Sequence, residues 1–145
     1  MQEASWIMPQ SPSGEPRHVF VYGTLRAGGT NDIRRYAPAP AFVGGATVAG
    51  VLHDLGAYPG MVLGGSSSVR GEVYRIDSDL EAALDRLEEV TEDDSGEYVK
   101  RYVAVMVRDV SLRCLVYEIH PSRIAQPAVI DSGDWLEYLV SSKRK

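Results

Sequence analysis

The order of hydrophobic residues near the start of the chain predicts a buried strand that ends abruptly. Val19, Phe20 and Val21 are consecutive β-forming residues without a polar interruption, which is typical of a strand buried on both faces. Tyr22 and Gly23 follow directly, and glycine allows a sharp turn with its backbone open to a ligand. We therefore expect the strand to lead into a loop at the floor of an active site.

The backbone of this loop is a candidate binding site. Gly23, Thr24 and Leu25 follow the break, so their three N–H groups are expected to lack a sheet partner. If these groups converge, they form a nest that suits a carboxylate or a developing oxyanion. A simple strand-to-loop turn is the alternative interpretation of the same residues.

The next part of the chain predicts a curved sheet. After the loop, Asn31 is expected to cap a short helical turn over residues 33–36. Residues 42–63 then alternate β-forming residues with glycines, which mark bulges and sharp curvature in strands. We expect a loop over 64–68 and a further strand over 69–76.

The clearest helical pattern covers residues 79–89. Ser78 followed three residues later by Glu81 predicts a capping box at its start. Glu88 lies about 90° from the centre of the apolar stripe, whereas Glu89 lies almost opposite it. Glu88 is therefore the glutamate at the core boundary, although such a glutamate alone is typically a solvated charge. The stripe consists of Leu80, Ala83, Leu84 and Leu87.

The last third of the chain predicts a hairpin and a helix. Strands over 98–107 and 112–119 are expected to pair through a connection at 109–111. Cys114 shares a face with Leu112 and Val116, which indicates a small core residue rather than a nucleophile. A final helix over 131–140 is expected to pack against the sheet through Trp135, Leu136, Leu139 and Val140.

Several of these segments resemble one known family. V-Y-G-T-L-R-A-G over 21–28 with Asn31, Y-P at 58–59, G-E-V-Y at 71–74 and L-D-R-L-E at 84–88 are similar in order and spacing to the gamma-glutamyl cyclotransferase-like family. The similarity runs from about residue 19 to about residue 139. It implies that Tyr22, Gly23, Thr24 and Leu25 cradle a 5-oxoproline-like group and that Glu88 is the catalytic acid/base.

Two segments stay outside the predicted site. The resemblance places Tyr58 and Pro59 near the substrate, but Pro59 followed by glycine is itself a typical turn. The family often shows Tyr-x-Arg after the acidic helix, whereas Tyr98 and Arg101 are one residue further apart. We transfer neither role.

The fold expected from these elements is α+β. A curved, mixed and mainly antiparallel sheet closes towards a small barrel, with helices on its flank, as in the gamma-glutamyl cyclotransferase-like family. Residues 1–17 read as a disordered leader, because they carry mostly Ser, Pro, Gly and charge. A single domain is expected over residues 18–142.

Composition narrows the function classes. A net charge of -5 gives no footprint for nucleic acid or an anionic membrane, and no apolar run is long enough to span a bilayer. The single Cys114 excludes an internal disulfide and favours a cytoplasmic location. Gly29 stands where a phosphate-binding P-loop needs lysine, and no zinc-ligand spacing or serine-nucleophile elbow occurs. No metal or organic cofactor is predicted.

The position of Glu88 predicts a raised pKa. It falls at the end of its helix, where the dipole disfavours negative charge, and partial burial acts in the same direction. Glu89, Glu92, Asp93 and Asp94 add like charge. A carboxyl group with a pKa nearer neutrality is better suited to shuttling protons at physiological pH.

The function expected from the resemblance is gamma-glutamyl cyclotransfer, which releases 5-oxoproline and a free amine from a gamma-glutamyl amine or peptide. The partner is this small-molecule substrate, with no oligomeric state predicted. Two alternatives stay open. One is a non-catalytic module that binds an amino-acid-like anion, and the other is a gamma-glutamyl amidase that uses water.

Overall fold

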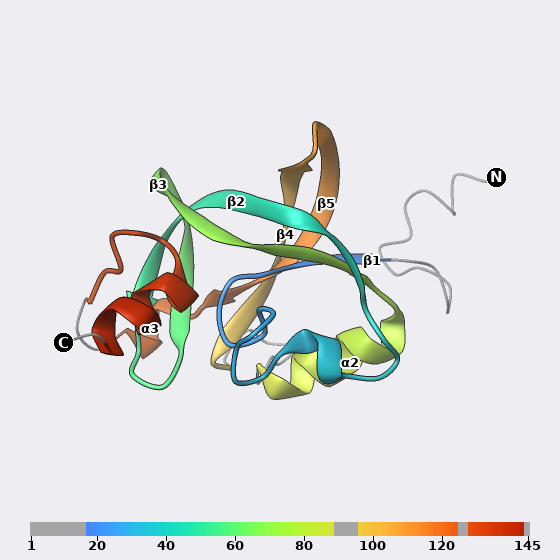
Figure 1. The fold of residues 1–145 in the computed structure, drawn as a ribbon, viewed down its shortest axis with the longest axis horizontal. Helices are drawn as coiled ribbons and strands as arrows, with labels where there is room; N and C mark the ends of the chain where they lie inside the picture. The colour runs from blue at the N-terminus through green and yellow to red at the C-terminus, as the bar shows by residue number, and fades with distance from the viewer. Residues whose placement is uncertain (1–16, 89–95, 125–127, 144–145) are drawn as a thin grey trace.

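A five-stranded mixed sheet forms the centre of the protein (Figure 1). The structure is a computed structural model that describes residues 17–88, 96–124 and 128–143. The predicted α+β class is confirmed. The elements are β1 (Arg17–Val21), the 3-10 helix η1 (Ile33–Arg35), β2 (Ala41–Asp54), β3 (Pro59–Ile76), α2 (Ser78–Leu87), β4 (Tyr98–Val107), β5 (Val110–Ile119), the 3-10 helix η2 (Pro121–Arg123) and α3 (Trp135–Lys143).

The short strand β1 lies in the middle of this sheet. The strand order is β2-β3-β1-β5-β4, with β1 antiparallel to β3 and parallel to β5. Phe20 packs into one hydrophobic cluster, whereas Val19 and Val21 pack into the cluster on the other face. The predicted strand with two buried faces is therefore confirmed.

The sheet is curved but not closed into a barrel. The edge strands β2 and β4 contact one another, and a Cβ atom on Gly44 would lie 2.7 Å from Cγ1 of Val107. In the described residues, however, the hydrogen-bonded strand order ends at β2 and β4 without pairing them. The prediction of a curved sheet that closes towards a barrel agrees with this shape.

The predicted loop at 64–68 is wrong, because these residues belong to β3. The register shifts there: Ala49 pairs with Ser68, whereas the next residue of β2, Gly50, pairs with Leu63. Residues 64–67 therefore form a bulge, and glycines at 64 and 65 with φ angles of 97° and 88° allow it. Pairing with β2 keeps a loop-like sequence within the strand.

In both helices an aspartate, and not the predicted residue, is the N-cap. Asp77 caps α2, because its Oδ1 accepts a 2.9 Å hydrogen bond from the N–H of Leu80. The capping box of Ser78 and Glu81 is therefore wrong, and buried Glu81 instead accepts hydrogen bonds from Arg17 and Lys100. In the same way, Asp32 rather than Asn31 caps η1.

The β4–β5 hairpin forms with a tighter turn than expected. Arg108 and Asp109 both have positive φ angles, 50° and 69°, which are typical of a two-residue hairpin turn. Strand β5 therefore begins at Val110, and the predicted connection at 109–111 is wrong by one or two residues. Cys114 lies in the core, and burial raises its pKa to about 11, as expected for an inert thiol.

The last helix lies beside the far end of the β2–β3 hairpin (Figure 1). Trp135 is 2% exposed, and Leu136 and Leu139 pack at the edge of the same cluster. Val140 is 51% exposed, so its predicted packing is wrong. Helix α3 begins at Trp135, because Asp134 accepts a hydrogen bond from the N–H of Glu137 at 3.1 Å.

The predicted leader falls almost entirely outside the described residues. Residues 1–16 are not described, and Arg17, the last residue of that segment, begins β1. None of the described helices is both long enough and apolar enough to cross a membrane.

The two candidate caps of α2 make a direct test. Asp77→Ala is expected to lower the free energy of unfolding by about 1 kcal/mol, because the N–H of Leu80 loses its acceptor. Ser78→Ala is the matched control, and we expect a change within about 0.5 kcal/mol. Urea denaturation measures both. A larger loss in the Ser78 variant would contradict the assignment of the cap.

Candidate active site

A cavity of about 400 Å³ lies where the loop after β1 meets the end of α2. The start of β3, the start of β4, the residues directly before each of these strands and one side chain of β5 complete its wall. The residues that line it are Phe20, Val21, Tyr22, Gly23, Thr24, Leu25, Thr30, Asn31, Ala57, Tyr58, Pro59, Leu87, Glu88, Glu97, Tyr98 and Tyr117.

All five residues of the predicted site line this one cavity. Tyr22, Gly23, Thr24 and Leu25 come from the loop, and Glu88 comes from the end of α2. In Figure 1 the loop and α2 lie on the same side of the sheet. The fold thus places these residues together, although they are far apart in sequence.

The loop backbone is held by its own hydrogen bonds. The N–H of Asn31 donates to the carbonyl of Thr24 at 2.8 Å, and the N–H of Ile33 donates to the carbonyl of Leu25 at 2.9 Å. By contrast, no acceptor for the N–H groups of Gly23, Thr24 and Leu25 is found among the residues that the structure describes. The loop thus offers three backbone donors at the cavity wall.

Gly23 is required because the loop packs tightly against the start of β3. A Cβ atom at this position would lie 2.7 Å from Cγ of Pro59. The φ angle of Gly23 is not in the left-handed region, so the constraint is close approach rather than turn conformation. Tyr58 and Pro59, left outside the predicted site, are therefore part of its wall.

The hydroxyl group of Tyr22 forms two hydrogen bonds inside the core. It donates to the carbonyl of Tyr117 at 2.6 Å and accepts from the N–H of Met61 at 3.1 Å. Burial raises the pKa of this phenol well above its ordinary value, with a smaller contribution from Glu88. Tyr22 therefore stays neutral and joins β1, β3 and β5 beneath the cavity.

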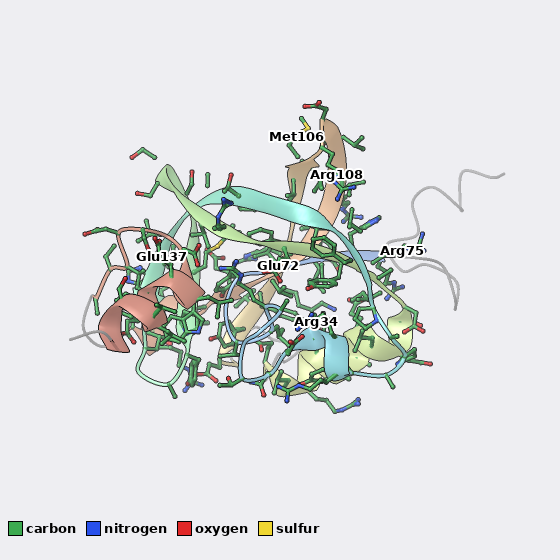
Figure 2. All side chains as sticks on the ribbon, in the orientation of Figure 1. Arg34, Glu72, Arg75, Met106, Arg108 and Glu137 are labelled. Carbon is green, nitrogen blue, oxygen red and sulfur yellow. The ribbon has the colours of Figure 1, made fainter. Side chains whose placement is uncertain are left out.

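A buried ion cluster fixes the far end of the loop. The guanidinium of Arg26, whose residue is 9% exposed, donates to Glu72 at 2.8 Å and to Asp134 at 2.8 Å. Glu72 also accepts from the N–H of Ala27 at 2.9 Å and from the hydroxyl of Tyr74 at 3.1 Å. Figure 2 shows Glu72 near the middle of the molecule, where β3 passes the loop.

The carboxylate of Asp32 links two parts of the loop through hydrogen bonds. Asp32 accepts hydrogen bonds from the N–H of Gly28 at 2.8 Å and from the N–H of Arg34 at 2.9 Å. Hydrogen bonding from the Arg34 side chain holds the pKa of Asp32 well below its usual range. Gly29 is needed as glycine, since a Cβ there would lie 2.4 Å from the carbonyl oxygen of Thr24.

Glu88 lies half-buried directly after α2, as the C-cap of that helix. Burial raises the pKa of its carboxyl group to about 8, and the nearby Glu97 carboxylate contributes in the same direction. The predicted rise in pKa is confirmed, with burial as its largest cause. In the described ranges, no hydrogen bond to the Glu88 carboxylate is found. The other predicted contributors, at 89 and 92–94, lie outside the described residues.

Sequence reasoning missed the other side of the cavity. Glu97, Tyr98 and Tyr117 line it, and the hydroxyl of Tyr98 donates to the carbonyl of Pro59 at 2.8 Å. The hydroxyl of Tyr117 donates to Asp85 Oδ1 at 2.7 Å. Tyr98 was recognisable as a possible family position, whereas nothing in the local sequence distinguishes Glu97. In the described part of the chain, no group of three or more His, Cys, Asp or Glu side chains could hold a metal ion.

Comparisons with known proteins agree with this fold. A family model described as "Gamma-glutamyl cyclotransferase, AIG2-like" matches residues 19–137. A putative gamma-glutamylcyclotransferase from Vibrio cholerae is 36% identical over 127 residues, which cover 82% of this chain and 95% of the relative.

Two solved structures have the same fold. YkqA from Bacillus subtilis superimposes with a TM-score of 0.71 at 28% identity; the match covers 90% of this chain but only 44% of YkqA. The AIG2-like protein GGACT from Mus musculus has a TM-score of 0.64 at 26% identity, with 81% of this chain and 90% of that chain covered. Because the family model spans most of the sequence, the chain belongs to the gamma-glutamyl cyclotransferase, AIG2-like family.

Proposed function

We propose that this protein is a gamma-glutamyl cyclotransferase that converts a gamma-glutamyl amine or peptide into 5-oxoproline and a free amine. The observation that carries the proposal is the Glu88 carboxyl group, with a pKa of about 8, in one cavity with loop N–H groups that have no acceptor among the described residues. The α-amino group at a chain end titrates near about 8, and the free α-carboxylate of a γ-glutamyl substrate raises the pKa of its α-ammonium group above that value. Proton transfer from this group to ionised Glu88 is therefore only modestly uphill.

The reaction needs no nucleophile from the protein. Ionised Glu88 takes a proton from the α-ammonium group, and the amine nitrogen then attacks the substrate's own γ-carbonyl carbon. A five-membered ring forms while negative charge develops on the carbonyl oxygen. When the bond to the leaving nitrogen breaks, protonated Glu88 gives its proton to that nitrogen, and the ionised carboxylate then takes the second proton from the ring nitrogen, which becomes the lactam N–H. Passing this second proton to the released amine restores ionised Glu88, so the substrate is divided into 5-oxoproline and the amine in its ammonium form.

The loop supplies binding and charge stabilisation in this proposal. The N–H groups of Gly23, Thr24 and Leu25 hold the glutamyl head or its developing oxyanion. Tyr22 supports the loop from below through its hydrogen bonds to Tyr117 and Met61. Incubation with a panel of γ-glutamyl amines and detection of 5-oxoproline tests the activity directly.

Glu88→Gln is expected to lower kcat/KM by at least about a hundredfold, because the glutamine amide cannot accept and return the proton. The matched control is Asp79→Asn, an exposed carboxylate on the first turn of the same helix and outside the cavity lining. Initial rates of 5-oxoproline release measure both variants. Equal losses in the two variants would contradict the role of Glu88.

Glu88→Gln is also expected to change how stability depends on pH. The carboxyl group ionises near its ordinary value of 4.5 in the unfolded chain, but near about 8 in the folded protein. The folded state therefore binds this proton more tightly, and that contribution to stability is lost as the pH rises from about 4.5 through about 8. We expect the melting temperature of the variant, relative to wild type, to be higher at pH 8.5 than at pH 5. An unchanged difference would show that Glu88 titrates normally.

Acetylation of the substrate α-amine separates cyclotransfer from hydrolysis. If the α-amine attacks, the acetylated substrate should yield no product, and hydroxylamine should trap no γ-glutamyl-enzyme as a hydroxamate. Product chromatography should show 5-oxoproline as the only acyl product from the unmodified substrate. Release of free glutamate, or turnover of the acetylated substrate, would favour an amidase that uses water.

A further inference from the structure

The tyrosine hydroxyl groups around the cavity all donate to acceptors other than Glu88. Four tyrosines line the cavity among the described residues, and a phenol has a single proton to donate. Tyr22 donates to the carbonyl of Tyr117, Tyr58 to the carboxylate of Glu97, Tyr98 to the carbonyl of Pro59, and Tyr117 to the carboxylate of Asp85. Glu88 therefore shares its cavity with four phenols but receives a hydrogen bond from none of them.

The surroundings of Glu88 make these hydroxyl groups important. A hydrogen bond donated to a carboxylate stabilises its ionised form and lowers its pKa. Burial raises the pKa of Glu88 to about 8, the Glu97 carboxylate adds to the rise, and no described cation offsets it. The other described groups that interact electrostatically with Glu88 are phenols with raised pKa values, which stay neutral: Tyr22, Tyr36, Tyr98 and Tyr117. The acidity of Glu88 therefore depends on where the neighbouring hydroxyl protons are donated.

Tyr117 is the phenol that lies beside two carboxyl groups of α2. Asp85 is on the last turn of this helix and Glu88 is its C-cap, so the two side chains are neighbours on the helix surface. The hydroxyl of Tyr117 donates to Asp85 Oδ1 at 2.7 Å, and Tyr117 lines the cavity together with Glu88. Without Asp85, Glu88 is the next carboxyl group along α2 that this hydroxyl can meet.

Asp85 is held in place by a row of alternating charges. Lys100 from β4 donates to Asp85 Oδ2 at 3.0 Å and also to Glu81, which lies one turn earlier on α2. Arg17 from β1 pairs with the other oxygen of Glu81. Because Lys100 binds one oxygen of Asp85, the second oxygen is left for Tyr117. The strands β1 and β4 thus set the orientation of Asp85.

We propose that Asp85 is a positioning residue: by accepting the Tyr117 hydroxyl, it keeps this donor away from Glu88 and so maintains Glu88 as a weak acid that can both take and return a proton. Asp85 does not line the cavity, so it acts on the reaction only through Tyr117 and Glu88. The benefit to turnover rests on the proposed cyclotransferase function. The hydrogen-bond arrangement itself can be tested without a substrate.

Titration of Glu88 in the free protein tests the arrangement. Carbon-detected NMR of protein labelled at its glutamate carboxyl groups follows each carboxyl group, and the signal lost in Glu88→Gln identifies Glu88. In Asp85→Ala the Tyr117 hydroxyl is released, and we expect Glu88 to titrate about one pH unit lower than in wild type. Asp79→Ala, which removes an exposed carboxylate from the first turn of α2, should leave the titration unchanged.

Tyr117→Phe separates the hydroxyl from the charge of Asp85. Removing a nearby negative charge alone also lowers the pKa of a carboxyl group, so Asp85→Ala is repeated in the Tyr117→Phe background. We expect no downward shift of Glu88 there, and an equal shift in both backgrounds would overturn the proposal. Tyr117→Phe alone leaves the ion pairs of α2 in place, so it serves even if Asp85→Ala does not fold. A rise of the Glu88 pKa in this variant would show that the hydroxyl already donates to Glu88, and the proposal would be wrong.

The pH profile of kcat/KM connects this arrangement to the reaction. The acidic limb, which requires ionised Glu88, should move about one pH unit lower in Asp85→Ala and stay near wild type in the double variant. A loss of folded protein lowers the rate at every pH but does not move the limb. Turnover with an unshifted Glu88 titration in Asp85→Ala would overturn this inference and leave cyclotransfer intact. A shifted titration without 5-oxoproline from any γ-glutamyl amine would support the role of Asp85 and overturn the proposed function instead.

Discussion

The ion cluster around Arg26 is the interaction on which the binding loop depends. A guanidinium buried to this degree is stable only with well-placed partners, and Glu72 and Asp134 provide them from β3 and from the start of α3. Since Glu72 also binds the N–H of Ala27, the same carboxylate that neutralises Arg26 fixes the loop backbone. These contacts hold the loop without using the N–H groups of Gly23, Thr24 and Leu25, for which no acceptor is found among the described residues.

Glu88, unlike Arg26, is placed where its charged form is disfavoured. Its carboxyl group lies where burial and a neighbouring carboxylate both oppose ionisation, and no described residue compensates it with a hydrogen bond. Such an arrangement lowers stability above neutral pH, and it is expected where a proton must be taken and returned. Asp32 shows the contrast in the same molecule, because hydrogen bonds from Arg34 and Gly28 lower its pKa. The environment, not the residue type, separates the structural carboxylate from the candidate catalytic one.

The sequence was sufficient for features that depend on local order. The run from Val19 to Val21 predicted the central strand, and helix phase placed Glu88 at the core boundary. Features that depend on distant partners were missed: the Gly-Ser segment at 64–67 stays in β3 because β2 pairs on both sides of it, and Glu97 reaches Glu88 only through the fold. The prediction of the α2 cap was wrong for a different reason. Asp77 and Ser78 are both good N-cap residues, and only the backbone geometry distinguishes them.

The position of β1 has a consequence for how the cavity is built. In the strand order, β2 and β3 form one hairpin, β4 and β5 form another, and β1 joins the two through ladders on each side. Pro59 belongs to the first hairpin, Tyr98 and Tyr117 belong to the second, and the loop continues from the end of β1. The cavity therefore lies where the two hairpins meet, and these hairpins also share one hydrophobic cluster. A small change in the twist of one hairpin against the other therefore changes the width of the cavity. The geometry of the sheet thus sets how well a substrate fits.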